Sequence, residues 1–271
     1  MSYFGGLIKP RNMNKRGTLT FLGTGTSQGI PIIGCDCPTC ASSDPKDKRL
    51  RSSVHIVFHG VHLQIDTGPD FRTQMLQNNL RHVDAVLITH EHQDHIAGLD
   101  DTRPLIFRTK KDMPIYGQER VLQRIRKVYD YAFQDHHYPG APKFELHTVA
   151  TEPFEIQGVT VVPLPVWHGK LPILGYRVGR MAYITDTNGL PESTLELLND
   201  LDILVLDALQ NEPHFSHYTL EESRAVAEQI GAKQTYFIHM SHKLPPHSEV
   251  QPILGAGQFL GYDGLTVTFG E

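Results

Sequence analysis

The chain has 271 residues, of which 39% are hydrophobic and 20% charged, and its formal net charge is −5. This length allows one large domain or two small ones, and the composition is typical of a folded soluble protein. The negative charge argues against broad electrostatic binding to nucleic acid. The sequence has no apolar run of about eighteen residues, so no membrane span is predicted. Residues 1–17 lack the apolar stretch of a secretory signal, so we expect a cytoplasmic protein.

Strand-like segments recur through the first half of the chain. Runs rich in β-branched and aromatic residues predict strands, and here they occupy residues 18–22, 54–58, 62–65, 83–89, 113–116 and 145–149. After the fifth run, apolar residues at helical spacing predict a helix over residues 119–133. Its apolar stripe consists of Val121, Leu122, Ile125, Val128, Tyr129 and Ala132.

The second half repeats this pattern, with predicted strands at residues 159–164, 175–178, 182–185, 203–206, 235–238 and 265–269. A proline near its start favours a helix over residues 191–199. Thr219 and Glu222 form a capping-box pattern that opens a helix to about Ile230, which Gly231 ends. Two strand-rich halves with helices between them indicate two sheets packed on each other, with helices outside. We expect a single domain over residues 1–271.

The buried run at 83–89 leads directly into the sequence T-H-E-H-Q-D-H. His90, His92, Asp94 and His95 thus place three imidazoles and a carboxylate within six positions. Imidazole suits zinc and similar ions, and carboxylate suits manganese and other hard ions. Two such sets of ligands can serve paired ions about 3.5–4 Å apart. The alternative is a solvated His-rich loop, but the spacing favours a metal site.

Three later apolar runs also finish on residues that bind metals. They end at His168, Asp186 and His239. A single polar residue at a strand end often does no more than mark the exit of the strand into solvent. Three of them, together with the first cluster, favour a dinuclear metal site built at one edge of the fold.

The cysteines Cys35, Cys37 and Cys40 form a C-x-C-x-x-C pattern. Three thiolates in a reducing compartment indicate a metal site that lacks one ligand, because structural zinc is tetrahedral. His242, three residues after His239, is the best candidate for the fourth ligand of a zinc-binding loop at residues 35–40. The alternative is a loop with free thiols.

The ordered set of ligand-type residues resembles that of the metallo-β-lactamase-fold hydrolases over nearly the whole chain. The resemblance implies an α/β (α+β) fold, a four-layer αββα sandwich. It also implies two divalent ions, the first bound by His90, His92 and His168, the second by Asp94, His95 and His239, with Asp186 bridging both. Asp66, in Q-I-D-T-G, matches an early strand-end aspartate that orients a ligand rather than binding metal.

A bridging aspartate favours the phosphodiesterase branch of that superfamily. The segment T-G-T-S-Q-G-I-P before the cysteines, with H-x-x-H near the end, closely resembles the PhnP-type phosphodiesterases, which act on cyclic phosphodiesters. The resemblance implies a metal-dependent phosphodiesterase for small cyclic or nucleotide-like diesters, with manganese or zinc in the dinuclear site and one structural zinc. It assigns catalytic roles to Asp94 and Asp186, and makes His217 a general acid or substrate contact. His217 could also be a simple helix-entry histidine.

Two other functions stay open, namely a tRNase Z-like ribonuclease and a non-catalytic, metal-dependent nucleotide-binding protein. Nucleic acid and membrane partners are not expected, whereas a homodimer stays open. Arg103 could hold a phosphate through paired donors or form a structural ion pair. The aromatic and His-rich segment 132–140 could line a substrate pocket or pack against a second subunit.

Overall fold

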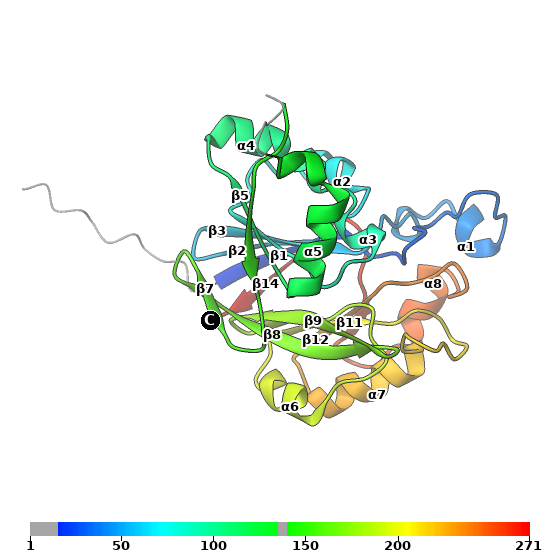
Figure 1. Ribbon diagram of the computed structural model, residues 1–271. Helices are drawn as coiled ribbons and strands as arrows, with labels where there is room; N and C mark the ends of the chain where they lie inside the picture. Colours follow the sequence, from blue (N-terminus) through cyan, green and yellow to red (C-terminus); the bar gives the residue numbers. More distant parts are fainter. Residues whose placement is uncertain (1–15, 135–139) are drawn as a thin grey trace, which may run out of the picture.

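In the computed structural model, residues 16–134 and 140–271 are described. Two seven-stranded sheets lie face to face, and helices cover the outer side of each (Figure 1). The first sheet has the order β14-β1-β2-β3-β4-β5-β6. Its strands are β1 (Arg16–Gly23), β2 (Ser53–Phe58), β3 (Val61–Ile65), β4 (Ala85–Leu87), β5 (Met113–Gly117), β6 (Phe144–Thr148) and β14 (Thr266–Gly270).

The second sheet has the order β13-β12-β11-β10-β9-β8-β7. Its strands are β7 (Phe154–Ile156), β8 (Val159–His168), β9 (Leu171–Val178), β10 (Met181–Tyr183), β11 (Ile203–Asp207), β12 (Gln234–Ile238) and β13 (Gln258–Leu260). The strands β10 to β13 pair in parallel, so their carboxyl ends meet at one edge of the sheet. On the first sheet, β3, β4 and β5 are likewise parallel.

The helices are short and lie mostly outside the sheets. They are α1 (Pro38–Ala41), α2 (Phe71–Gln77), α3 (Gln93–Ile96), α4 (Arg103–Thr109), α5 (Glu119–Val128), α6 (Glu192–Leu195), α7 (Leu220–Ile230) and α8 (His247–Val250). Single 3-10 turns add η1 (Pro45–Asp47), η2 (Leu99–Thr102), η3 (Asp130–Ala132), η4 (Glu196–Leu198) and η5 (Gln251–Ile253). No described helix has the length and apolar character needed to cross a lipid bilayer.

Strand alternation explains the layers, because successive side chains of a strand point to opposite faces. In β2, Val54, Ile56 and Phe58 belong to the core between the two sheets, whereas Ser53 and His55 face the opposite side. Two further apolar cores pack the outer face of each sheet against its helices. The four-layer αββα architecture predicted from the sequence is therefore confirmed.

The predicted strands agree with the structure except at a few points, whereas the helices α1, α2, α4 and α8 were not predicted. The strands β7 and β13 were not predicted, because each has three residues and pairs at a sheet edge. The helix predicted over 119–133 is wrong in length: α5 ends at Val128, where Tyr129 leaves helical geometry, and η3 follows. The Thr219 capping box is confirmed, and Gly231 ends α7 with a left-handed φ of 68°.

Candidate metal centre

The backbone turns sharply where three strands reach the same edge. Asp66 follows β3 with a φ of 59°, Asp186 follows β10 with a φ of 54°, and His239 follows β12 with a φ of 59°. A left-handed conformation in a non-glycine residue costs roughly 1–3 kcal/mol and is concentrated at functional sites. Here it lets three polar side chains leave their strands and point into one buried region.

The first group of donors combines the H-x-H pattern with the end of β8. The ligand atoms of His90, His92 and His168 all lie within 4.8 Å of one another. His90 is fully buried, and its Nε2 atom lies 2.9 Å from Nδ1 of His92. The H-x-H spacing places both rings on the loop that joins β4 to α3, and β8 carries His168 to meet them.

The second group lies against the first, and Asp186 stands between them. Asp186 Oδ2 is 3.8 Å from His90 Nε2. Asp186 Oδ1 is 3.4 Å from His95 Nε2 and 3.1 Å from His239 Nδ1. Asp94 Oδ2 lies 3.1 Å from the same nitrogen of His95. All seven residues that the sequence pattern selected thus converge on one region, with a carboxylate at its centre.

Hydrogen bonds fix which nitrogen of each ring faces this centre. Asp66 Oδ2 accepts a hydrogen bond from His95 Nδ1 at 2.7 Å, and Asp66 also accepts bonds from Thr89 N and Oγ1, each at 2.9 Å. His168 Nδ1 donates to the carbonyl of Ser216 at 3.0 Å. In both histidines, the Nε2 atom is left to face the centre. Histidines that bind metals are commonly anchored in this way through the other nitrogen.

A cation would satisfy the buried atoms of this donor set better than their contacts with one another do. His95 Nε2 is buried and lies within 3.4 Å of two carboxylate oxygens, yet it makes no hydrogen bond with any described residue. Burial alone would raise the pKa of Asp186, but His239 and His95 hold it well below its usual value. Two carboxylates and several imidazoles thus aim at a shared point, where positive charge would offset their burial.

His217 lies at the margin of this donor set, at the start of α7. Its ligand nitrogen lies within 4.8 Å of the ligand nitrogen of His168 and of a carboxylate oxygen of Asp186. Behind it, the fully buried Asp207 places Oδ1 3.4 Å from His217 Nδ1 and accepts the backbone N–H of Asp186 at 3.2 Å. Burial would lower the pKa of His217, but Asp207 raises it to about 8. Asp207 thus favours the protonated imidazole, which can donate a proton.

The sequence analysis missed Asp207, although a signal was present. Its strand, β11, reads I-L-V-L-D, a fourth apolar run that ends on a carboxylate. Gln64 and Ser53 were also not predicted, and both donate hydrogen bonds to the backbone of Asp66. The Asp66 carbonyl accepts Gln64 Nε2 at 2.9 Å and Ser53 Oγ at 3.0 Å. These buried contacts hold the left-handed peptide in place.

The cysteine cluster lies at the start of α1, beside the segment that follows β12. The ligand atoms of Cys35, Cys37, Cys40 and His242 lie within 4.8 Å of one another, the right chemistry for a structural zinc. Cys35 Sγ is 3.1 Å from His242 Nδ1. The backbone N–H of Cys40 lowers the pKa of Cys37 to about 6. His239 and His242 thus lie in two separate donor clusters, joined by one short segment.

The sequence left open the roles of Arg103 and of the segment 132–140. Arg103 forms an ion pair with Asp100 at 2.7 Å and donates to the carbonyl of Gly140 at 3.3 Å, so its guanidinium is engaged within the fold. Of the segment 132–140, residues 135–139 lie outside the described residues, and Ala132 is buried. A different arginine, Arg120, forms an ion pair with Glu91, which lies between His90 and His92 in the sequence.

Comparison with known proteins agrees with this geometry. The sequence pattern of the Beta-lactamase superfamily domain matches residues 62–240, which hold every donor of the dinuclear centre. The chain belongs to the metallo-β-lactamase superfamily. A solved structure described as a new diphosphatase from the PhnP family is 46% identical, with a TM-score of 0.88, over 94% of this chain and 97% of that one. Within the superfamily, this chain is therefore a member of the PhnP family.

Two curated relatives carry other names. An octanoyltransferase of Porphyromonas gingivalis is 40% identical over 253 residues, which are 92% of this chain and 51% of that protein. The chain thus spans about half the length of this relative. A ribonuclease Z of Acaryochloris marina is 24% identical over 85% of this chain and 88% of that protein. In a superfamily member, the histidine and carboxylate set would hold divalent metal ions, and its donor chemistry fits them.

Proposed function

We propose that this chain is a metal-dependent hydrolase that cleaves small cyclic or nucleotide-like phosphodiesters. The observation that carries the proposal is the position of His217, a buried cationic acid supported by Asp207, directly beside the dinuclear donor set. Hydrolysis of a phosphodiester releases an alkoxide, which needs a proton to depart. The fold thus offers a proton donor beside a place for two cations.

The dinuclear site would hold two divalent ions, manganese or zinc, through His90, His92, Asp94, His95, His168, Asp186 and His239. When bound, such ions lower the pKa of water and offset negative charge on phosphoryl oxygens. Asp186 would contribute a ligand to both halves of the site, because its two oxygens face different histidines. Asp66 keeps His95 in one orientation. His217 would protonate the leaving oxygen.

A second candidate bond is the P–O–P link of a diphosphate, favoured by the 46% identity to a PhnP-family diphosphatase. The two bonds differ in their leaving group. An alkoxide is a strong base that needs the His217 proton, whereas a phosphate leaves without one. The octanoyl transfer named for the Porphyromonas relative belongs to a protein about twice as long as this chain.

The test compares His217→Gln with the parent protein on two diesters after loading with manganese. For a cyclic ribose phosphate, we expect kcat to fall by about 10²-fold or more, because the lost proton donor contributes about that factor. Bis(p-nitrophenyl) phosphate has a weakly basic leaving group, so its turnover should change little. Equal losses on both diesters would contradict the acid role.

A diphosphate dinucleotide and a precursor tRNA complete the assay. Cleavage of the dinucleotide at a rate far above that of the cyclic diester would favour the diphosphatase candidate. We expect the precursor tRNA to stay intact, since the chain carries a net charge of −5. Tight nucleotide binding with no turnover of any substrate would instead indicate a non-catalytic binding protein.

A further inference from the structure

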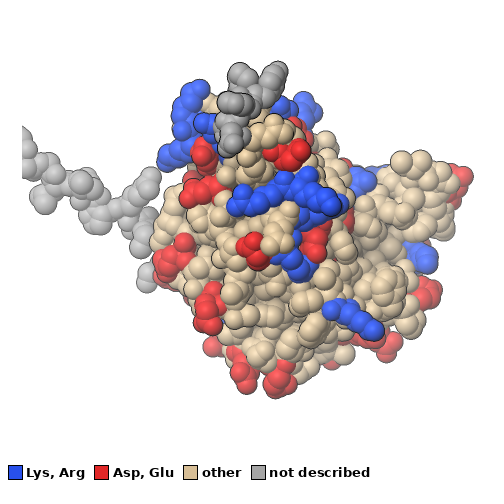
Figure 2. Space-filling view, in the orientation of Figure 1, with Lys and Arg blue, Asp and Glu red and all other residues tan. Residues whose placement is uncertain are grey.

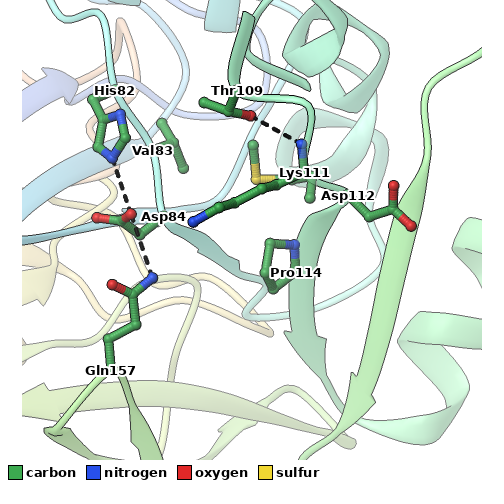
Figure 3. A pocket seen from close by; sticks show the side chains of 9 residues that line it. His82, Val83, Asp84, Thr109, Lys111, Asp112, Pro114 and Gln157 are labelled. Atoms are coloured by element: carbon green, nitrogen blue, oxygen red, sulfur yellow. Dashed lines mark hydrogen bonds and ion pairs between the residues drawn. The ribbon is translucent and has the colours of Figure 1, made fainter. Parts of the chain in front are cut away.

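A cavity of about 340 Å³ lies at the end of β4 opposite the metal centre (Figure 3). Its polar groups are paired with one another. His82 Nε2 lies 2.9 Å from Asp84 Oδ1, and Gln157 Nε2 donates to the same oxygen at 3.4 Å. The side chain of Lys111 points toward Asp84 across the cavity. This cavity therefore has little unsatisfied charge to offer a ligand.

The groove between α2 and α4 is different in chemistry. It encloses about 280 Å³, and an apolar floor is formed by Phe71, Met75 and Leu105. Leu76 lines the same groove with 63% of its surface exposed. Large apolar side chains this exposed beside a concave surface commonly mark a contact site. The groove lies on the outer side of the first sheet, where both helices pack (Figure 1).

Three arginines surround this floor, namely Arg72, Arg81 and Arg108, and Asp101 is the only carboxylate of the lining. Among the described residues, none of the three guanidinium groups forms an ion pair within 4.0 Å. Elsewhere in the fold, Arg51 and Arg180 do pair with carboxylates. Unpaired guanidinium groups next to buried apolar surface are suited to a carboxylate or phosphate.

The local charge contrasts with that of the whole chain. The lining carries three arginines against one aspartate, whereas the chain has a net charge of −5. Lys and Arg side chains gather on the upper part of the face in Figure 2, over α4 and α5. The three lining arginines therefore favour an anion in the groove, and the apolar floor favours anions that carry an apolar part.

We propose that the α2–α4 groove binds a small amphiphilic anion, an aliphatic chain that ends in a carboxylate or phosphate. The chain would lie on Phe71, Met75 and Leu76, and the anionic head would contact Arg72 and Arg108. This site is separate from the metal centre and does not depend on the proposed hydrolase activity.

Calorimetric titration of the metal-loaded protein with sodium octanoate tests the proposal, with butanoate and octyl glucoside as comparisons. Each buried methylene is worth about fourfold in affinity, so octanoate should bind at least about tenfold more tightly than butanoate in this half-open groove. The neutral octyl glucoside should bind at least about tenfold more weakly than octanoate, because it lacks the charge. Equal affinity for octanoate and butanoate would overturn the proposal.

Variants locate the site. The exposed pair Arg72→Gln/Arg108→Gln should weaken octanoate binding by about tenfold, and Leu76→Ser by several-fold. The matched control Arg124→Gln/Lys127→Gln removes the same charge from α5 and should leave the affinity unchanged. Octanoate binding that persists in the groove variants, or falls equally in the control, would show that the ligand contacts another surface, such as the metal centre. Thermal unfolding confirms that each variant is folded.

Discussion

The two donor clusters of this protein are built in opposite ways. The histidine and carboxylate centre is made of strand ends, and His90, His95 and Asp186 are no more than 3% exposed. The cysteine cluster is made of a loop and a one-turn helix, and Cys35 and Cys37 are partly exposed. Hydrogen bonds from the sheets orient the first cluster before any ion arrives. In the second cluster, the contacts to sulfur come from loop and helix backbone, where Ile32 N and Cys40 N donate to Cys40 Sγ and Cys37 Sγ at 3.4 Å.

Within the cysteine cluster, the pKa values of Cys40 and Cys37 are shifted in opposite directions. Burial raises the pKa of Cys40 to about 11, while the backbone N–H of Cys40 lowers that of Cys37 to about 6. Three thiolates so close together repel one another unless a cation lies between them. We infer that the fold supports the dinuclear centre, whereas zinc would support the fold around the cysteine loop. The predictions below test this contrast.

The largest effect is expected at the centre of the dinuclear site. Asp186→Ala removes the carboxylate that faces both groups of histidines, so turnover should fall by about 10³-fold or more. The strands around it stay packed, so the circular dichroism spectrum and unfolding cooperativity should match the parent protein. Turnover within tenfold of the parent would remove the bridging role of Asp186.

Asp66→Asn should have a smaller effect on the same centre. Asparagine tolerates the left-handed backbone, but it loses the charge that orients His95. We expect metal affinity at the centre to fall by about 10–100-fold, as measured by equilibrium dialysis with elemental analysis. The exposed control Asp101→Asn should keep parental affinity. A matching loss in the control would mean that overall charge, not orientation, sets the affinity.

In the cysteine loop, the effect should appear in stability rather than in chemistry. Cys37→Ser should lower zinc content by about one ion per chain and reduce the free energy of unfolding by about 2–3 kcal/mol, because metal binding is coupled to folding. Denaturant unfolding and elemental analysis measure both quantities. A parental zinc content would count against the cysteine site, whatever the stability.

The last effect, which appears only at low pH, concerns the polar column of Ser53, Gln64 and His55 behind Asp66. His55 is buried, and this burial lowers its pKa from 6.5 to about 4, while its Nδ1 lies 3.2 Å from Gln64 Oε1. The unfolded chain binds this proton below pH 6.5 and the native protein does not, so stability falls between pH 6.5 and pH 4. His55→Gln should remove up to about 3 kcal/mol of that loss at pH 4. An unchanged slope of stability against pH would contradict this.

Sequence reasoning located the donors because their residue types are rare at strand ends. His90, His168 and Asp186 could be selected from spacing alone, and the structure brings them together. Asp207 was not selected although its strand also ends on a carboxylate, because its contact with His217 joins two segments that a linear pattern does not pair. The polar column of Ser53, Gln64 and His55 escaped for the same reason, since each residue is ordinary until the strands pair.

For Arg103, the sequence suggested a contact that the fold does not make. Its position after the ligand loop allowed a phosphate contact, yet its side chain reaches Asp100 and the carbonyl of Gly140 instead. Which atoms a long side chain contacts is decided by neighbouring loops, which sequence patterns describe poorly. The three-residue strands β7 and β13 were not predicted for the same reason, because each exists only through pairing at a sheet edge.

The left-handed backbone at Asp66, Asp186 and His239 limits how this centre can be redesigned. A β-branched replacement at any of these positions would strain the main chain before it touched an ion. Asparagine and glycine are accepted there, but glycine offers no side-chain donor. A mutant library aimed at exchanging the metal would therefore be most productive at His90, His92 and His168, which lie outside the left-handed region.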